Sequence, residues 1–448
     1  MYPDPLEGMS LIRKIISLAF KLEFLIVECV PILKSNKNQI IHLTQHQIGS
    51  LLANAFLVLF PDDRRYAGGV GTNRGFNKNK YTKFLPTINF DTLYTDNIDY
   101  KENRKIEKLK CLLNYFHRIT SLIFPSSSQP GSPVSTVISF STPFPQPPPV
   151  MLPVLRDPNA CAGVVTFKRR SIPQLRAPMW SKSVKPIQPV FMCSEGLIED
   201  SGDTLQIDFA HKFVGGAILD HGMVQEEIRF VINPELIVSH LFTEKLMDNE
   251  VLFVIGTERY NRYTGYGNHF RWDGDFEDTI PRNQFCRRMT HIVAMDAMSF
   301  VNSAREYSPF YTKRELMKAY CAFAKDNDDN DNNSNDKTIA TGNWGCGVYG
   351  GDKRFKIIIQ ILAASEAERH LKYFTFGDIH FKNEIESFLI KLIQIDPDIN
   401  VGKVFNLLIQ YGKEEVHFPI SNLQLRPIFE KFVFSDLSLH MDEKTSWE

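Results

Sequence analysis

The sequence predicts an α/β protein that carries an all-helical unit at its N-terminus. Three observations lead to this fold class. Apolar residues recur at helical spacing over residues 10–59, short apolar segments alternate with helical patterns beyond Ala162, and a proline-rich stretch lies between the two regions. With 448 residues, the chain is long enough for about two to three domains.

Composition limits the kinds of partner. The chain has 51 Lys and Arg residues against 52 Asp and Glu residues, a net charge of -1. A balanced charge creates no overall positive field, so we expect no direct nucleic-acid partner. The seven cysteines are scattered without a C-x-x-C pair, which argues against a zinc site. We therefore expect neither a metal nor a cofactor, and an anionic ligand must be held by a local group of donors.

The first 124 residues are expected to form a helical accessory domain. Thr44 and Gln47 have the spacing of a capping box, which predicts a helix over residues 44–60. A further amphipathic pattern covers residues 108–123. In the most apolar N-terminal stretch, residues 11–33, charged residues leave a charge-free run of only residues 15–20, which is too short to cross a membrane, so no membrane partner is expected.

Residues 125–160 are expected to be a linker or an insertion, because nine of the 25 prolines fall between Pro125 and Pro153. The α/β domain should then cover residues 161–430, with a solvated Asp/Asn loop at 326–336 and a tail at 431–448. Apolar runs predict strands at residues 163–167, 205–209, 251–256 and 373–376, and helices at residues 315–323, at 355–362 and from Asn233-Pro234 onward.

A glycine-rich segment stands out before the helix expected at 355–362. Five glycines fall within residues 342–351, so main-chain N–H groups there can approach an anion such as a diphosphate. Gly345, Gly347 and Gly350 also match the dinucleotide-binding fingerprint of nicotinamide-dependent oxidoreductases, but the acidic partner falls inside a helix, at Glu366 or Glu368. A structural turn is the other alternative.

A second segment places two adjacent carboxylates, Glu226 and Glu227, just after a glycine-rich turn. Charges in the first turn of a helix are usually solvated, which is the simpler interpretation. Consecutive helical side chains diverge by about 100°, so one carboxylate can grip a sugar hydroxyl while the other reaches the bond being broken.

A third segment is rich in aromatic residues, which are more often core than ligand platform. Tyr266 lies between two glycines, where a bend can expose its ring for stacking on a base. The other aromatic residues of interest are Tyr260, Tyr263, Phe270, Tyr373, Phe374 and Phe376.

These segments occur in the order found in one family. The motifs are Gly215-Gly216, Gln225-Glu226-Glu227, Tyr263-Thr264-Gly265-Tyr266, Gly342-Asn343-Trp344-Gly345-Cys346-Gly347 and Tyr373-Phe374-Thr375-Phe376-Gly377-Asp378. Together they resemble poly(ADP-ribose) glycohydrolase, and the likeness extends over residues 40–415 apart from the two low-complexity stretches. The resemblance implies a macrodomain-like mixed sheet flanked by helices, with an N-terminal all-helical accessory domain. It also implies a glycoside hydrolase that cleaves ribose–ribose bonds in poly(ADP-ribose) and releases ADP-ribose.

The resemblance also implies roles for individual residues. Glu227 would act as general acid and then as base, Glu226 and Gln225 would orient the scissile ribose, and Asp208 would brace the loop around them. Main-chain groups of residues 345–349 would hold the diphosphate. The full set of substrate-binding residues implied in this way is Gln225, Asp208, His211, Gly215, Gly216, Ile198, Glu199, Tyr266, Asn343, Gly345, Cys346, Gly347, Val348, Tyr349 and Phe376.

Two residues depart from the family pattern. Ala217 replaces the third glycine of its signature, where a methyl group would hinder the ribose or forbid a positive φ, and His211 stands where the family usually has Asn. The alternative function is therefore an ADP-ribose-binding module with little or no activity. The expected partners are poly(ADP-ribose) and ADP-ribosylated proteins, and the chain is expected to be a monomer. It should act in the nucleus, the cytoplasm or both, with a place in the DNA damage response.

Overall fold

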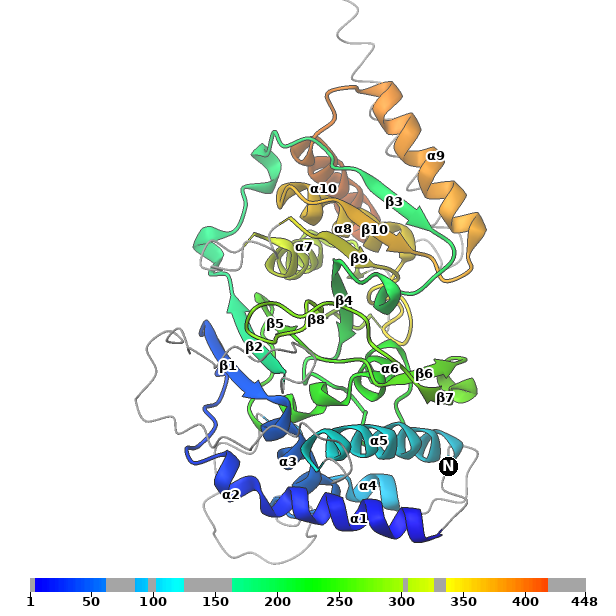
Figure 1. Cartoon of the computed structure of the whole chain (residues 1–448). Helices are drawn as coiled ribbons and strands as arrows, with labels where there is room; N and C mark the ends of the chain where they lie inside the picture. Colours follow the sequence, from blue (N-terminus) through cyan, green and yellow to red (C-terminus); the bar gives the residue numbers. More distant parts are fainter. Residues whose placement is uncertain are drawn as a thin grey trace, which may run out of the picture.

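The computed structural model describes residues 5–61, 85–95, 102–124, 163–300, 305–325 and 336–417. An eight-stranded mixed sheet runs through the middle of the molecule, in the order β1-β2-β5-β8-β4-β9-β10-β3 (Figure 1). This arrangement, with helices on both sides, confirms the fold class. The linker at 125–160, the tail at 431–448 and nearly all of the Asp/Asn loop lie outside the described residues.

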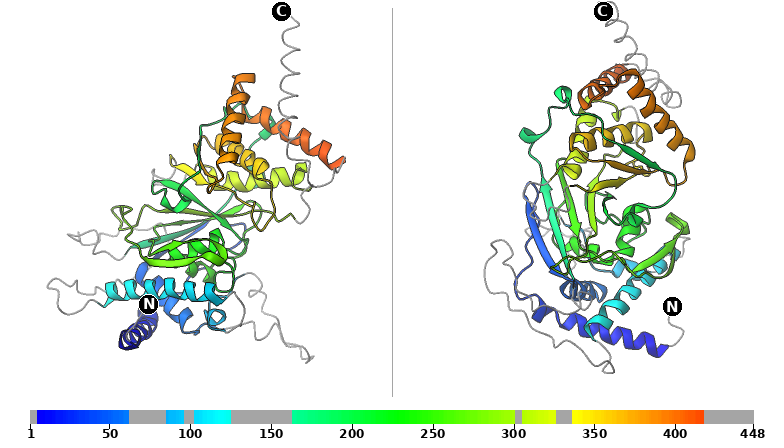
Figure 2. Two further views of the ribbon diagram at one scale, coloured as in Figure 1. Left: turned by 90° about the vertical axis from the view of Figure 1, so that its right-hand side faces the viewer. Right: turned by 45° about the horizontal axis from the view of Figure 1, so that its top comes forward.

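The N-terminal helices lie together at one end of the molecule (Figures 1 and 2). The capping box is confirmed: the Thr44 side chain accepts from the Gln47 N–H, and the Gln47 side chain accepts from the Thr44 N–H. Buried residues of these helices form one hydrophobic cluster with residues of the sheet and of the segments beside it. The helices are α1 (Pro5–Phe20), α2 (Leu22–Leu25), α3 (Gln45–Phe56), α4 (Asp91–Tyr94) and α5 (Glu102–Ile123).

The N-terminal segment also contributes a strand that the sequence did not predict. Strand β1 (Gln39–Thr44) pairs antiparallel with β2 (Val164–Ser171) at the edge of the sheet. Ile41 and Leu43 are buried, and the residues before each of them face outward. Two buried residues are too short a signal of alternation beside strong helical patterns.

Five strands run parallel to one another: β8 (His291–Asp296), β4 (Thr204–Ala210), β9 (Thr338–Thr341), β10 (Leu371–Phe374) and β3 (Val190–Cys193). Strand β5 (Glu250–Ile255) is antiparallel to β8 and to β2. The expected strands are confirmed as β2, β4, β5 and β10, whereas β3, β8 and β9 were not predicted. The loops that follow the five parallel strands all lie at one edge, where open α/β sheets bind ligands.

The remaining helices complete the layers. Helices α7, α8, α9 and α10 lie on the side of the sheet away from α1 and α5 (Figure 1). The segment from Asn233-Pro234 is a 3₁₀ helix, η6, with the proline in its first turn. Within the described ranges, no helix combines the length and the apolar character that a membrane crossing requires. The elements not yet named are η3 (Gln174–Arg176), η4 (Trp180–Lys182), η5 (Ile198–Asp200), α6 (Gln225–Ile232), η6 (Pro234–Leu241), β6 (Asn261–Thr264), η7 (Gly267–His269), β7 (Arg271–Asp275), α7 (Pro309–Phe323), α8 (Lys353–Glu366), α9 (Ile379–Ile395) and α10 (Val401–His417).

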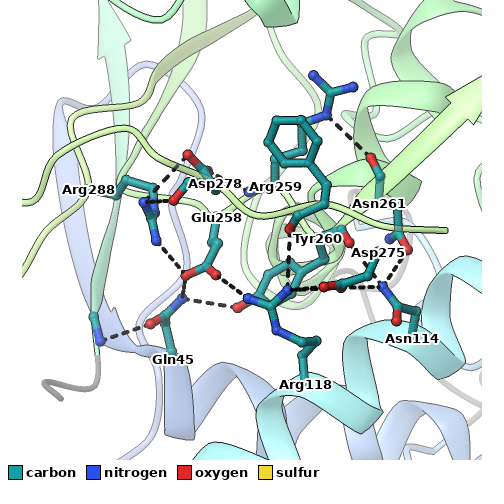
Figure 3. Close-up of polar contacts among 12 residues, drawn as sticks. Gln45, Asn114, Arg118, Glu258, Arg259, Tyr260, Asn261, Asp275, Asp278 and Arg288 are labelled. Atoms are coloured by element: carbon teal, nitrogen blue, oxygen red, sulfur yellow. Dashed lines mark hydrogen bonds and ion pairs between the residues drawn. The ribbon is translucent and has the colours of Figure 1, made fainter. Parts of the chain in front are cut away.

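A buried polar network joins the N-terminal helices to the sheet domain (Figure 3). The Glu258 carboxylate accepts from Arg118 on α5 at 3.1 Å, from Arg282 at 2.8 Å and from Arg288 at 3.0 Å. Gln45 on α3 donates to Glu235 at 2.7 Å. Since charges in such networks are costly to leave unpaired, the network stabilises one arrangement of the two units.

This network predicts a pH dependence of stability. Burial, with Glu258 nearby, raises the pKa of Glu235 from 4.5 to about 7. The protonated Glu235 carboxyl contributes its full stability at pH values below its pKa in the unfolded chain. This contribution is lost as the pH rises through its pKa in the folded protein. We expect the free energy of unfolding of Glu235→Gln to fall less than that of the wild type between about pH 4.5 and about pH 7, by on the order of 2–3 kcal/mol. Urea midpoints measured at both pH values check this, and parallel curves would contradict it.

Candidate active site

Four of the expected site segments follow parallel strands. The loop after β3 leads to Ile198 and Glu199, the loop after β4 leads to the glutamate pair, the loop after β9 is the glycine-rich segment, and Phe376 follows β10. Strand β4 pairs with β9, so the two loops that carry the expected chemistry start from neighbouring strands. The fifth segment, with Tyr266, is the turn of the β6–β7 hairpin.

The two glutamates are buried and held by main-chain donors. Only 3% of Glu226 and 5% of Glu227 is exposed, so the interpretation as solvated first-turn charges is wrong. Glu226 accepts from the N–H groups of Gly215 at 2.5 Å and His211 at 2.9 Å. Glu227 accepts from those of Ala217 at 3.0 Å and Val224 at 2.9 Å. The loop of residues 211–224, here named the glutamate loop, therefore wraps around both carboxylates.

A third carboxylate lies close to the pair. Asp208, at the end of β4, is fully buried, and neither of its oxygens has a hydrogen-bond partner among the described residues. Burial, with Asp208 and Glu227 nearby, raises the pKa of Glu226 well above its usual range. Burial, partly offset by Arg229, raises the pKa of Asp208. Three acidic groups in one buried site favour at least one protonated carboxyl, which general acid catalysis requires.

Gln225 connects helix α6 to strand β4. Its side-chain oxygen accepts from the Phe209 N–H at 2.8 Å, and its side-chain nitrogen donates to the Ile207 carbonyl at 3.1 Å. The amide thus pairs with the strand as a neighbouring strand would. This pairing fixes the start of α6, and with it the direction of both glutamates.

The glycines of the glutamate loop are required by geometry. Gly215 and Gly216 have φ angles of +96° and +51°. A Cβ on Gly216 would lie 2.7 Å from an oxygen of Glu226 and 2.7 Å from an oxygen of Glu227. Ala217 has no positive φ, so the backbone here does not need the conformation that its methyl group would forbid.

His211 has its ring beside the loop it belongs to. Its Nδ1 is 3.2 Å from the Phe213 N–H, and its ring packs against that of Phe213 with centroids 5.9 Å apart. Burial lowers the pKa of His211, and the opposing effects of the Phe213 carbonyl, Asp296 and Glu227 are smaller. The imidazole is therefore mostly neutral at pH 7 and places no positive charge beside the glutamates.

The glycine-rich loop presents unused main-chain donors. Within it, the N–H groups of Trp344, Cys346, Gly350 and Gly351 bond to carbonyls of the same loop. Among the described residues, no acceptor is found for the N–H groups of Gly347, Val348 and Tyr349. The N-cap Asp352 accepts from the first N–H groups of α8. The loop amides, and not the end of the helix, are thus the donors available to an anion.

The glutamate pair and the glycine-rich loop interact electrostatically. Burial, with the negative charges of Glu226, Asp296 and Glu227, raises the pKa of Tyr349 to about 12. Charges act in this way only on a group close to them. The phenol at the end of the glycine-rich loop therefore lies within electrostatic reach of the carboxylates, and the two loops start from the neighbouring strands β4 and β9.

The aromatic residues divide into core and surface. Tyr260 and Tyr373 are fully buried, as the core interpretation expected. Tyr266 is 57% exposed and Phe376 is 42% exposed. Phe376 has a φ of +54°, a strained conformation for a bulky residue and one that occurs most often at functional sites. Burial of the ring, together with the charge of Glu227, raises the pKa of the Tyr266 phenol.

The remaining candidates lie around this centre. The Glu199 carboxylate accepts a hydrogen bond from the Tyr263 hydroxyl of the β6–β7 hairpin, and Ile198 is buried beside it. Asn343 accepts from the Tyr373 hydroxyl at 3.0 Å. Glu366, a possible dinucleotide partner, lies in the last turn of α8 and accepts from Ser183 at 2.5 Å. In the part of the chain that the structure describes, no three His, Cys, Asp or Glu side chains come together as potential metal ligands.

Comparisons with known proteins agree with this geometry. A family model described as the macro domain fold of poly(ADP-ribose) glycohydrolase matches residues 177–383, and one described as its helical domain matches residues 9–142. Poly(ADP-ribose) glycohydrolase 1 of Arabidopsis thaliana is 31% identical over 457 residues, covering 86% of this chain and 72% of the relative. Probable poly(ADP-ribose) glycohydrolase 2 of the same plant is 30% identical, covering 84% of this chain and 70% of the relative. Poly(ADP-ribose) glycohydrolase 1 of Caenorhabditis elegans is 31% identical, covering 60% and 33%. The chain belongs to the poly(ADP-ribose) glycohydrolase family.

Proposed function

We propose that the chain hydrolyses the ribose–ribose O-glycosidic bond of poly(ADP-ribose) and releases ADP-ribose. One observation carries the proposal: the buried glutamate pair and the glycine-rich loop, with its unused N–H groups, lie together at the carboxyl ends of β4 and β9. A diphosphate needs main-chain donors, and a glycosidic bond needs a carboxyl group. A shared site provides both for one ligand.

The proposed chemistry uses Glu227 twice. Its carboxyl proton goes to the oxygen that leaves as the bond to the anomeric carbon breaks. The carboxylate then takes a proton from water as the water oxygen bonds to that carbon, which restores the acid. Positive charge develops on the ribose between these steps, and the bound diphosphate and the nearby carboxyl oxygens of Glu226 stabilise it.

The adenosine is proposed to lie beside the loops that follow β3 and β10 and the turn of the β6–β7 hairpin. Tyr266 and Phe376 are the exposed aromatic rings of the site segments, so they can pack against a base. Ile198 and Glu199, on the neighbouring loop, are the proposed contacts to the adenine edge. The backbone of residues 345–349, entered at Asn343, is proposed to hold the diphosphate.

The alternative, a binding module without activity, rested on Ala217 and His211. Both residues keep the main-chain hydrogen bonds to the glutamates, and Ala217 carries no backbone strain. These contacts support the active enzyme over the silent module.

The test is incubation of the full chain with poly(ADP-ribose), followed by chromatography of the products. Release of ADP-ribose supports the hydrolase. Tight binding of ADP-ribose without any release supports the binding module, and reduction of NAD in the presence of an alcohol would support the oxidoreductase.

Tyr266→Ala tests the proposed base platform. Loss of a base stack costs about 1–3 kcal/mol, so we expect KM for poly(ADP-ribose) to rise by about fivefold to about 150-fold with kcat little changed. Arg262→Ala, on the same hairpin, removes an exposed side chain that donates to the Asp273 carbonyl, so it is the matched control for the fold of the hairpin. An unchanged KM in Tyr266→Ala would assign this ring to the scaffold instead.

A further inference from the structure

We propose that Lys108, a residue of the helical domain, is a positioning residue of the active site, an inference that rests on the proposed role of the glutamate pair. Lys108 lies on α5 and is fully buried. It falls in register with Cys111, Leu112 and Tyr115, which form the buried face of the helix. A charged side chain on such a face is rare unless polar partners receive it.

The partners of Lys108 are carbonyls of the glutamate loop. The ammonium donates to Ala217 at 3.1 Å, to Ile218 at 2.8 Å and to Asp220 at 2.6 Å. An ammonium has three N–H donors, and here each can be matched by one carbonyl. Lys108 therefore holds a short stretch of main chain that is more than 100 residues away in the sequence.

Two further carbonyls of this stretch, which Lys108 does not contact, accept hydrogen bonds from other side chains of the helical domain. The Thr92 hydroxyl, on α4, donates to the Leu219 carbonyl, and Arg104, on α5, donates to the His221 carbonyl at 2.8 Å. Five consecutive carbonyls, from Ala217 to His221, thus accept hydrogen bonds from side chains of α4 and α5.

The N–H groups of the glutamate loop donate to helix α6 and not to the helical domain. Those of Gly215 and Ala217 donate to Glu226 and Glu227. The loop is therefore held between the helical domain, which binds its carbonyls, and helix α6, whose carboxylates its N–H groups bind. Fixing the carbonyls fixes the peptide planes, and so limits where both carboxylates can lie.

Lys108 also interacts electrostatically with a carboxylate of the site. Burial lowers its pKa to about 7, against the pull of Glu227 and Asp220, while Arg104 and Lys105 on the same helix lower it further. The ammonium thus lies within electrostatic reach of Glu227. Arg229 acts on a third carboxyl of the site, where its charge partly offsets the rise in the pKa of Asp208.

The test compares the wild type with Lys108→Met in steady-state cleavage of poly(ADP-ribose). Methionine keeps the length and the burial of the side chain but has no N–H donors. We expect kcat to fall by about 30-fold, because the carboxylates lose their fixed position, and KM and ADP-ribose affinity to change by less than about threefold. Hydrogen exchange at the amides of residues 211–224 should become faster in the same variant.

The matched control is Lys110→Met on the same helix. Lys110 donates to Glu107, also on α5, at 2.6 Å and not to the glutamate loop. We expect its kcat and loop exchange to stay within about threefold of the wild type. A kcat of Lys108→Met within that range, or an equal loss in both variants, would overturn the proposal.

Two further outcomes are distinguishable. Where Lys108→Met does not fold, as judged by circular dichroism, Lys108→Gln replaces it. The Gln side chain is one atom shorter than that of lysine and places an acceptor oxygen among the three carbonyls, so a normal kcat would overturn the proposal while a lower kcat at normal KM supports it. A wild type that releases no ADP-ribose refutes the proposed function alone, because loop exchange that is faster only in Lys108→Met still supports the positioning role.

Discussion

Replacing Glu227 by glutamine is expected to lower kcat for poly(ADP-ribose) by about 1,000-fold, the usual contribution of a general acid and base. The variant keeps an acceptor for one of the two N–H groups, from Ala217 and Val224, that hold the carboxylate in the wild type. It loses the proton that would go to the leaving ribose. Because that proton is needed in the transition state and not for binding, the Kd for ADP-ribose should stay within about threefold of the wild type.

Two measurements define this result: kcat from release of ADP-ribose, and Kd from calorimetry. Glu235→Gln is the matched control, since it changes another buried glutamate, outside the site and only a few residues along the chain. Its turnover should remain close to that of the wild type. Near-normal turnover in Glu227→Gln would remove Glu227 from the proposed mechanism, whatever the control does.

Local signals in the sequence predicted much of the fold. The capping box at Thr44 and Gln47 predicted where α3 begins, because it depends on residues three positions apart. The strands β3, β8 and β9 were not predicted, since they have only four to six residues. Strands β8 and β9 are buried by neighbours that are distant in sequence, and β3 forms an edge of the sheet. Their order in the sheet is what brings the expected site segments to one edge.

The candidate site was predicted as a set of residues but not as an arrangement. Glu226 and Glu227 look like ordinary first-turn charges, and only the tertiary fold buries them under the N–H groups of the glutamate loop. Lys108 gave one signal, a lysine on the apolar face of an amphipathic helix. Its partners could not be predicted, because Ala217, Ile218 and Asp220 belong to another domain.

Replacing Gly216 by alanine is expected to lower kcat by about 100-fold, the cost of moving reacting groups by roughly 1 Å. The new Cβ would lie 2.7 Å from oxygens of both Glu226 and Glu227, closer than carbon and oxygen can approach, so the carboxylates must move. The residue would also have a φ near +51°, which costs alanine about 1 kcal/mol.

Gly267→Ala separates the two effects. Gly267 has a similar φ of +59°, but a Cβ there meets no atom within 4 Å. The control therefore carries the backbone strain without the collision, and it should lose about 1 kcal/mol of stability while keeping kcat within about threefold. A kcat for Gly216→Ala that matches the control would mean that the position of the carboxylates does not limit turnover. A large loss in Gly216→Ala alone would tie the rate to the space that this one glycine leaves for the two acids.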